Sequence, residues 1–453
     1  MAAIEGRKLG RFGVGLVLIS WLVTFFDGYD MNVISFASKR MEEAFRIGHA
    51  AFGYVFSVGI FGTLLGGVLF GYFGDRAGRR PAIITAAACF SALTLLLAFA
   101  RNLPELMILR FFAGLALGGA MPLIWSLNIE FAPRRLRATI ITLIMLGYGF
   151  GVAASGPVAS YILPRFDWPG VFVFGGVTSL VAVLILIARL PESLRLLASR
   201  ARRPELIART LRRMGVETPE DLAGARVFVA DEGAAGKPTF RLSMLFEGRL
   251  KVLTPLIWAA YFASSISTYF ITSWGPAVLR GLGFGLSGAG WLSFGNSLCS
   301  MAGGLAIMRF TDRHGAISIA VLPITAVPLL LVAGLAPMTL TQFLFLSLVM
   351  SVFLGGGHYG VTSVISAFYP SQIRASGSGW ANAAAKVGSV LGPLAGGYVL
   401  SSGLPMKMSY AFLAVCPALY GFAIVAIGLI ERSGGRWPGR GAPVRAASAS
   451  AAE

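Results

Sequence analysis

The sequence predicts an all-α membrane protein in which twelve transmembrane helices form two pseudo-symmetric six-helix bundles. Of its 453 residues, 56% are hydrophobic and 13% are charged, whereas soluble domains are about 45–50% apolar and about 25% charged. Apolar runs of about twenty residues recur along the chain, and each is long enough to cross a bilayer as a helix. The third observation is an internal repeat, since the second half of the chain resembles the first.

The membrane-spanning segments are expected from the start of the chain to near its end. The first apolar run follows Arg7, Lys8 and Arg11 and resembles a signal peptide. It is too long for the apolar region of a signal peptide and lacks a small-residue cleavage site, so we expect an uncleaved first span. The expected spans are residues 13–37, 51–73, 82–100, 105–129, 138–163, 169–189, 252–279, 286–308, 317–336, 340–368, 375–401 and 408–430.

A long polar segment divides these spans into six and six. We expect an N-terminal six-helix bundle in residues 1–189 and a C-terminal six-helix bundle in residues 252–431. Between them, residues 190–251 form a central loop on the cytoplasmic side with short amphipathic helices. Residues 432–453 are rich in Ala, Ser, Gly and Arg, a composition that predicts a disordered cytoplasmic tail.

The two halves repeat at one constant offset. GGVLFGYFGDRAG at 66–78 aligns with GGLAIMRFTDRHG at 303–315, and FAPRRLRAT at 131–139 aligns with FYPSQIRAS at 368–376, both 237 residues apart. A repeat of six spans keeps its orientation in the membrane. The halves are therefore expected to be parallel repeats about an axis along the membrane normal, with a substrate site near the midplane between them.

The formal net charge of +18 is compatible with nucleic-acid binding, but the distribution of charge argues against that function. Most of the Lys and Arg residues fall in segments on the same side of the membrane as the N-terminus, with or without the central loop. This bias follows the positive-inside rule and places both termini in the cytoplasm. We expect no nucleic-acid partner, and a bacterial inner membrane as the location.

Cysteines and cofactor motifs give no sign of an enzyme. Cys89, Cys299 and Cys416 all lie in apolar segments, so neither a disulfide framework nor a metal site is expected. No catalytic triad, metal cluster or nucleotide loop is apparent. We expect no enzymatic activity, no metal and no cofactor.

The stretch FFDGYDM places two acids inside the first apolar span. Asp27 and Asp30 are three residues apart, so they lie on one side of a helix. A charged Asp at the bilayer centre costs roughly 2.5–3.5 kcal/mol and usually faces the bundle interior or water. Their counterparts in the second half are Ser264 and Ser267, so only one half carries the acids. We interpret the pair as the proton-coupling site, the alternative being a solvated or capping pair at the outer end of the span.

Two basic residues also lie inside spans. Arg110 begins the apolar stretch LRFFAGLALGGAMP, and its guanidinium suits an acid of the first span or an anionic substrate. Lys386, in WANAAAKVGSVLGP, has no nearby acid in its own span. Both are candidate substrate-binding residues. A snorkelling Arg at a span end and a structural salt bridge of Lys386 are the alternatives.

Histidine and aromatic residues complete the candidate substrate site. His358 follows three glycines in LGGGHYG, and an imidazole can carry protons, although a lone His is more often a hydrogen-bonded core residue. Aromatic side chains with a polar group can both stack and hydrogen-bond, although most aromatic residues in such a chain serve packing. The candidates are Tyr148, Tyr261, Tyr269, Trp274 and Tyr359.

The stretch GYFGDRAGRRP at 71–81 resembles the cytoplasmic signature of the major facilitator superfamily, and RFTDRHG is its weaker second copy. The resemblance implies the major facilitator fold and a cytoplasmic gate, in which Asp75 pairs with basic residues such as Arg134, Arg135 or Arg137. RLPESLR at 189–195 is similar to the Pro-Glu-Ser motif of that family. The implied gate residues are Gly71, Asp75, Arg76, Gly78, Arg79, Arg80, Arg137, Asp312, Arg313 and Arg374.

Within the superfamily, DGYD resembles the signature of the aromatic acid:proton symporters, and the resemblance covers about residues 12–430. It implies transport roles for Asp27, Asp30 and Arg110. Many members carry Gln at the position of His358 and Arg at the position of Lys386, which bears on the substrate more than on the mechanism. We therefore expect a monomeric, proton-coupled importer of a small organic anion, namely an aromatic acid such as a hydroxybenzoate. A proton-driven exporter of drugs or metabolites and a non-transporting sensor of aromatic acids are the alternatives.

Overall fold

The protein is all-helical in a computed structural model, which describes residues 10–199, 204–214, 241–314, 316–364, 368–370 and 373–433. Within these residues, ten helices are long and apolar enough to cross a membrane. The fold class predicted from the sequence is confirmed. The predicted tail and part of the predicted central loop lie outside the described residues.

The first half of the chain forms one bundle. Its long helices are α2 (Arg11–Phe45), α3 (His49–Ala77), α4 (Arg79–Leu97), α5 (Leu103–Phe131) and α6 (Arg137–Arg189). Helix α6 covers two predicted spans, because the backbone reverses at Asp167, which has a positive φ of 55°. Two short helices follow, α7 (Leu194–Ser199) and α8 (Pro204–Arg213).

The second half forms the other bundle. Its helices are α9 (Leu250–Gly281), α10 (Leu286–His314), α11 (Val321–Leu335), α12 (Leu340–Val364), α13 (Arg374–Ser401), α14 (Met408–Leu413) and α15 (Val415–Ser433). Helix α10 occupies the predicted span 286–308 and is 29 residues long. It does not reach the apolarity of the ten spans, since Gly, Ser and Asn interrupt its apolar residues. Short 3₁₀ turns lie at Arg134–Leu136, Leu242–Phe246 and Ala316–Ala320.

The repeat seen in the sequence reappears in helix packing. A Cβ atom at Gly151 would meet the carbonyl of Phe25, and one at Gly388 would meet the carbonyl of Phe262. These two contacts are related by the offset of 237. Because only glycine permits such close backbone approach, the same residue type recurs at equivalent contacts.

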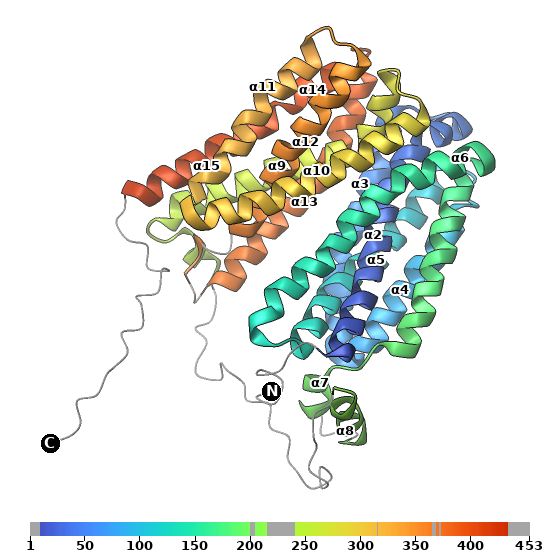
Figure 1. Cartoon of the computed structure of the whole chain (residues 1–453), viewed down its shortest axis with the longest axis vertical. Coiled ribbons are helices and arrows are strands. Elements are labelled where there is room, and N and C mark those ends of the chain that lie inside the picture. The colour runs from blue at the N-terminus through green and yellow to red at the C-terminus, as the bar shows by residue number, and fades with distance from the viewer. Residues whose placement is uncertain are drawn as a thin grey trace, which may run out of the picture.

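The two bundles meet along their helices at one end. Figure 1 shows them converging at the top of the view, where α3 lies against α13 and α6 against α10, and diverging toward the end where α7 and α8 lie. Gly53 packs against Pro393, and Gly290 packs against Gly156. These two contacts are also pseudo-symmetric at the offset of 237. The interface between the halves is therefore built from the same pair of positions, used twice.

Candidate functional site

A cavity of about 760 Å³ lies between the two bundles. Its walls come from α2, α3, α5 and α6 of the first half and from α9, α12 and α13 of the second half. Residues near the Asp75 end of the helices, such as Val68 and Asn382, belong to its lining. We call this space the central cavity.

The end opposite Asp75 is closed by contacts between the halves. Ser57 donates a hydrogen bond to the carbonyl of Val390 (2.7 Å), and the hydroxyls of Tyr54 and Tyr398 lie 2.6 Å apart. Ser35 donates to the carbonyl of Thr272 (2.9 Å). The central cavity therefore extends toward the Asp75 end and is sealed at the other end.

Asp27 and Lys386 both line the central cavity, from opposite halves. Asp27 is 9% exposed. The described residues provide Asp27 with no hydrogen bond or ion pair within contact distance. This arrangement places one carboxyl group and one ammonium group, neither with a direct partner in the described part of the chain, where a small ion could reach them.

Asp30 has a different environment from Asp27, although the two are three residues apart. Its carboxylate accepts a hydrogen bond from Arg110 (2.8 Å) and a longer one from Thr94 (3.4 Å). Asp30 and Arg110 are each 2% exposed, and neither lines the central cavity. The Arg110 guanidinium packs beside Gly59, where a Cβ atom would lie 3.4 Å from it, at ordinary contact distance. Of the two partners that the sequence left open for Arg110, the structure shows the acid of the first span.

Glycine at position 28 explains how the acids reach these places. A Cβ atom there would collide with the carbonyl of Tyr148 on α6. Because Gly28 lacks one, α2 and α6 approach closely between Asp27 and Asp30. The small residue in the DGYD stretch thus holds the acid-bearing helix against its neighbour.

Most of the predicted aromatic and histidine candidates share the central cavity. Tyr148, Tyr261, Tyr269, His358 and Tyr359 all line it. The His358 Nδ1 lies 3.2 Å from the hydroxyl of Ser264. Ser264 is the residue of the second half that corresponds to Asp27, so His358 contacts the position equivalent to the acid.

Trp274 is placed elsewhere. It is 0% exposed and donates its indole N–H to the carbonyl of Pro393 (2.8 Å). Its ring packs against Phe52, Phe56 and His49 at the closed end. In this structure Trp274 therefore supports the seal between the halves and does not line the cavity.

Several lining residues were not among the sequence-based candidates. Asn382 and Ser389 lie one turn before and one turn after Lys386 on α13, so helical spacing from Lys386 could have identified them. Trp125 on α5 also lines the cavity, and its indole N–H is buried without a hydrogen-bond partner among the described residues. No sequence signal distinguished this Trp from a packing residue.

The predicted gate residues of the first half gather at its Asp75 end. Arg79 forms an ion pair with Glu130, and the backbone N–H groups of Arg79 and Arg80 donate to Glu192 (3.0 and 3.1 Å). Ser193 donates to Glu130 (2.7 Å). Glu130 was not predicted, and Glu192 and Ser193 were noted only as a family motif. Together they join α4, α5 and the segment after α6 into one network.

The remaining gate residues have local roles where their side chains are described. Gly78 takes a φ of 124° at the turn between α3 and α4, which favours glycine, and the Arg76 guanidinium lies 4.3 Å from the Tyr72 ring centre. Gly71 has open space around it, and Asp75 is exposed. The side chains of Asp312 and Arg313 lie outside the described residues.

Arg137 and Arg374 repeat one contact across the two halves. Arg137 donates to the carbonyl of Ala132 (3.4 Å), and Arg374 donates to the carbonyl of Tyr369 (3.2 Å). Donors and acceptors are both related by the offset of 237. This contact of the repeat at 131–139 is thus reproduced in its second copy at 368–376.

The sequence matches the profile of the Major Facilitator Superfamily over residues 20–289 and 257–451. The chain belongs to this superfamily. Membership in a family of transporters confirms the predicted superfamily and the expectation that the protein is not an enzyme.

Characterised relatives share nearly the whole length of the chain. The 4-hydroxybenzoate transporter PcaK of Pseudomonas aeruginosa is 30% identical over 95% of this chain and 96% of its own. The gallate transporter of Pseudomonas putida is 29% identical, over 94% of each chain. The benzoate transport protein of Acinetobacter baylyi is 26% identical over 93% of this chain and 91% of its own. The superfamily transporter described here is therefore related to aromatic acid transporters, as its DGYD stretch predicted.

Solved structures agree on the fold. The inward open conformation of the xylose transporter XylE from E. coli superposes with a TM-score of 0.67 at 18% identity, covering 94% of this chain and 98% of that one. A bacterial homologue of the lysosomal transporter Spinster, in an inward-facing and occupied conformation, gives 0.68 at 17% identity, covering 94% and 98%. At these identities the likeness describes the fold alone.

Proposed function

We propose that this protein is a proton symporter of a bacterial inner membrane that imports an aromatic carboxylate, such as a hydroxybenzoate, by alternating access. The observation that carries the proposal is the central cavity, in which Asp27 and Lys386 face each other from opposite halves. Relatives named for 4-hydroxybenzoate, gallate and benzoate support the substrate class. The protein acts as a monomer, with both termini in the cytoplasm.

In this proposal the described structure is the inward-facing state, since the Asp75 end is then cytoplasmic and the opposite end, sealed here, faces outward. The substrate carboxylate binds Lys386, and its ring packs among the cavity tyrosines. Binding of the anion withdraws Lys386 from Asp27. Asp27 then favours its protonated form, because an unpaired carboxylate is costly inside the membrane. Proton and substrate are thereby coupled through one pair of residues.

Asp30 and Arg110 act differently in this proposal. Their direct ion pair satisfies both charges inside the first bundle, so they hold α2 and α5 in register and do not contact substrate. The network of Arg79, Glu130 and Glu192 stabilises the Asp75 end, which closes when the protein faces outward. Gate closure brings the two signature copies toward each other.

The test is uptake of a panel of labelled aromatic acids into proteoliposomes, with and without an inward-directed proton gradient. Gradient-stimulated accumulation of at least one acid is expected. In Lys386→Gln, the KM for that acid should rise about 10- to 100-fold, the scale of one charge-assisted hydrogen bond, while Lys386→Arg retains part of the affinity. Flux only outward would favour an exporter, and binding without flux would favour a sensor. Absence of binding and flux for every acid would refute the proposed substrate class.

A further inference from the structure

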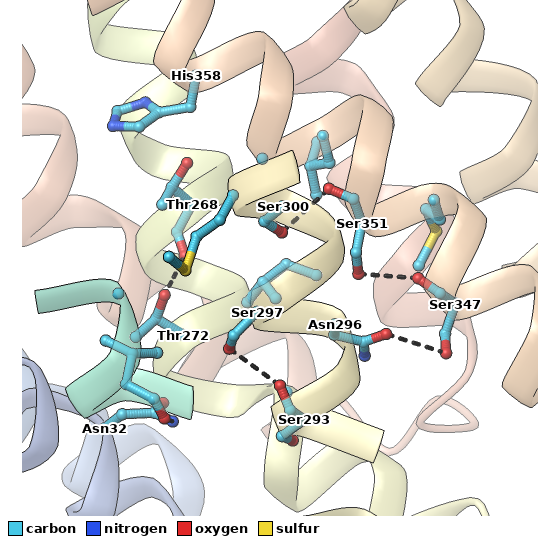
Figure 2. A pocket seen from close by; sticks show the side chains of 18 of the residues that line it. Asn32, Thr268, Thr272, Ser293, Asn296, Ser297, Ser300, Ser347, Ser351 and His358 are labelled. Atoms are coloured by element: carbon cyan, nitrogen blue, oxygen red, sulfur yellow. Dashed lines mark hydrogen bonds between the residues drawn. The ribbon is translucent and has the colours of Figure 1, made fainter. Parts of the chain in front are cut away.

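A second, smaller cavity of about 160 Å³ lies beside the central cavity, mainly within the second half. His358 and Tyr359 line both spaces, so the two adjoin at these residues. Figure 2 shows its polar side chains: Thr268 and Thr272 from α9, Ser293, Asn296, Ser297 and Ser300 from α10, and Ser347 and Ser351 from α12. We call it the serine pocket.

Most hydroxyl groups of the serine pocket already donate their protons to backbone carbonyls. Ser300 donates to the carbonyl of Ser351 (3.0 Å), and Ser351 donates to that of Ser347 (2.8 Å) (Figure 2). Ser297, Thr268 and Thr272 likewise donate to carbonyls of their own helices. A hydroxyl has one proton and two lone pairs, so each of these groups offers only acceptors to the cavity.

None of the described residues that line this pocket is a Lys or an Arg. A carboxylate carries only acceptors, so it meets mainly other acceptors in this pocket and no ammonium or guanidinium group. A phenolic hydroxyl carries a proton to donate and meets several acceptors at once. The chemistry of the serine pocket therefore selects neutral, hydroxyl-bearing groups and disfavours the acid end of a substrate.

The size of the pocket suits one aromatic ring. A cavity of about 150 Å³ in another protein admits benzene, and the serine pocket has about 160 Å³. Apolar side chains, among them Ile271, Met301 and Leu354, complete its walls. A ring can thus rest on apolar groups while its substituents reach the hydroxyl oxygens.

The equivalent place in the first half is filled. At the offset of 237, Ser347 corresponds to Arg110 and Asn296 corresponds to Gly59. Arg110 occupies the space beside Gly59 and pairs with Asp30. In the second half, Ser347 donates chiefly to the carbonyl of Leu344 (2.9 Å) and more distantly to the Asn296 amide oxygen (3.4 Å). The Asn296 amide nitrogen has no hydrogen-bond partner among the described residues. Substitution of a large charged group by small neutral ones has left a pocket with a donor to spare.

Resting on the proposed function, we infer that the serine pocket is a hydroxyl-binding subsite for the ring of a di- or trihydroxylated aromatic acid whose carboxylate stays in the central cavity. Asn32, Gly149 and Val152 of the first half close the pocket. A ring bound there touches both halves. The subsite therefore distinguishes substrates by the number of ring hydroxyls.

The experiment measures dissociation constants of the full-length, detergent-purified protein for benzoate and its 4-hydroxy, 3,4-dihydroxy, 3,4,5-trihydroxy and 3,4-dimethoxy derivatives. Each added hydroxyl should tighten binding about 3- to 10-fold, the range expected for one net hydrogen bond. The dimethoxy compound, which has no proton to donate, should bind no better than benzoate. In the double variant Ser347→Ala/Ser351→Ala the gain from the second and third hydroxyls should disappear.

Ser91→Ala is the matched control. Ser91 is a buried serine whose hydroxyl also donates to a carbonyl four residues earlier (2.9 Å), and it lines neither the central cavity nor the serine pocket. It should keep the wild-type dependence on hydroxyl number. Aromatic acids that bind with the same affinity whatever their hydroxyl count, or an unchanged dependence in the double variant, would overturn the subsite and leave the proposed function standing. Failure of every acid to bind the wild-type protein would overturn both.

Discussion

The two halves of this transporter share one architecture but differ in what fills equivalent positions. In the first half, Asp30 and Arg110 form a buried ion pair at 2.8 Å. In the second half, the same positions are Ser267 and Ser347. Ser267 donates to the carbonyl of Ala263, and Ser347 donates to that of Leu344. The repeat thus conserves helix packing while replacing ionic chemistry by neutral hydrogen bonds.

This difference separates two tasks. Close glycine contacts, such as Gly151 with Phe25 and Gly388 with Phe262, recur because both bundles need the same helix spacing. Charged groups appear where the membrane makes them costly, so they are kept for a purpose other than packing. We infer that the first half supplies Asp27 as the proton-linked acid, while the second half supplies Lys386 and the neutral serine pocket for the substrate.

The largest expected effect comes from breaking the buried pair. Asp30→Asn leaves Arg110 buried without a counter-charge, which should lower stability by about 3–5 kcal/mol. The double variant Asp30→Asn/Arg110→Gln removes both charges and should recover part of that loss. Unfolding of each variant in detergent, together with uptake in proteoliposomes, measures the two effects.

The reference for this comparison is Ser267→Asn, which changes the equivalent position in the second half. There the counterpart of Arg110 is the neutral Ser347, so the substitution leaves no buried charge unpaired at this site. It should cost much less than Asp30→Asn. A single variant Asp30→Asn as stable as the parent protein would show that the pair contributes little, and the contrast drawn between the halves would not hold.

The second prediction concerns Asp27, the acid that faces the cavity. Asp27→Asn has the shape of the protonated residue but cannot release a proton. Accumulation driven by a proton gradient should fall by at least about tenfold, whereas exchange of labelled for unlabelled acid should persist, since exchange needs no net proton movement. Glu43→Gln, an acid-to-amide change at an exposed position on the same helix, should leave both activities unchanged. Gradient-driven accumulation that survives in Asp27→Asn would remove this residue from coupling.

Hydropathy predicted the helices, because a membrane span needs a continuous apolar run. The internal repeat predicted the two bundles, because it divides the spans into two equivalent sets of six. Five of the six predicted aromatic and histidine candidates line the central cavity. Trp274 does not line the cavity, because it packs at the closed end. The sequence around Trp274 does not show at which level of the helix the two bundles come into contact. The partner of Arg110 was likewise undecided until α2 and α5 were placed side by side.

The serine pocket was not predicted from sequence, and the physical reason is clear. Serines in membrane helices commonly donate to carbonyls of the preceding turn, so Ser297 or Ser351 alone reads as ordinary packing. These serines form a pocket only because α9, α10 and α12 leave a space between them. The offset of 237 already aligned Ser347 with Arg110. That this replacement leaves a cavity depends on how the neighbouring helices pack, which the sequence does not show.

The third prediction tests the pseudo-symmetric seal. A Cβ atom at Gly290 would meet backbone atoms of Gly156 and the Ser160 hydroxyl, whereas one at Gly53 would approach only the Pro393 carbonyl closely, at 3.0 Å. Gly290→Ala should therefore destabilise the closed end by about 1–3 kcal/mol, and Gly53→Ala should do so by less. Spin labels can replace Tyr161 on α6 and Trp291 on α10, both of which are exposed. The change would appear as a longer or broader distribution of the distance between the two labels. Equal distributions in Gly290→Ala and the parent protein would contradict a tight seal at this contact.

The smallest effect is expected at the two turns that reverse the chain at the closed end. The first half uses Asp167 at φ 55°, where the second half has Gly403 at φ 77°, one residue from the exact offset. Asp167 accepts hydrogen bonds from the Trp168 N–H and from Arg40, both at 2.8 Å. Asp167→Gly relieves an unfavourable backbone conformation but loses these two bonds, one of them an exposed ion pair of small worth. We expect the two effects nearly to cancel, with the unfolding free energy in detergent changed by less than about 1 kcal/mol and uptake retained.

Asp167→Ala, which loses the bonds and keeps the strain, should be less stable than Asp167→Gly. If it were instead the more stable of the two, backbone conformation would not explain why a glycine serves at the second turn.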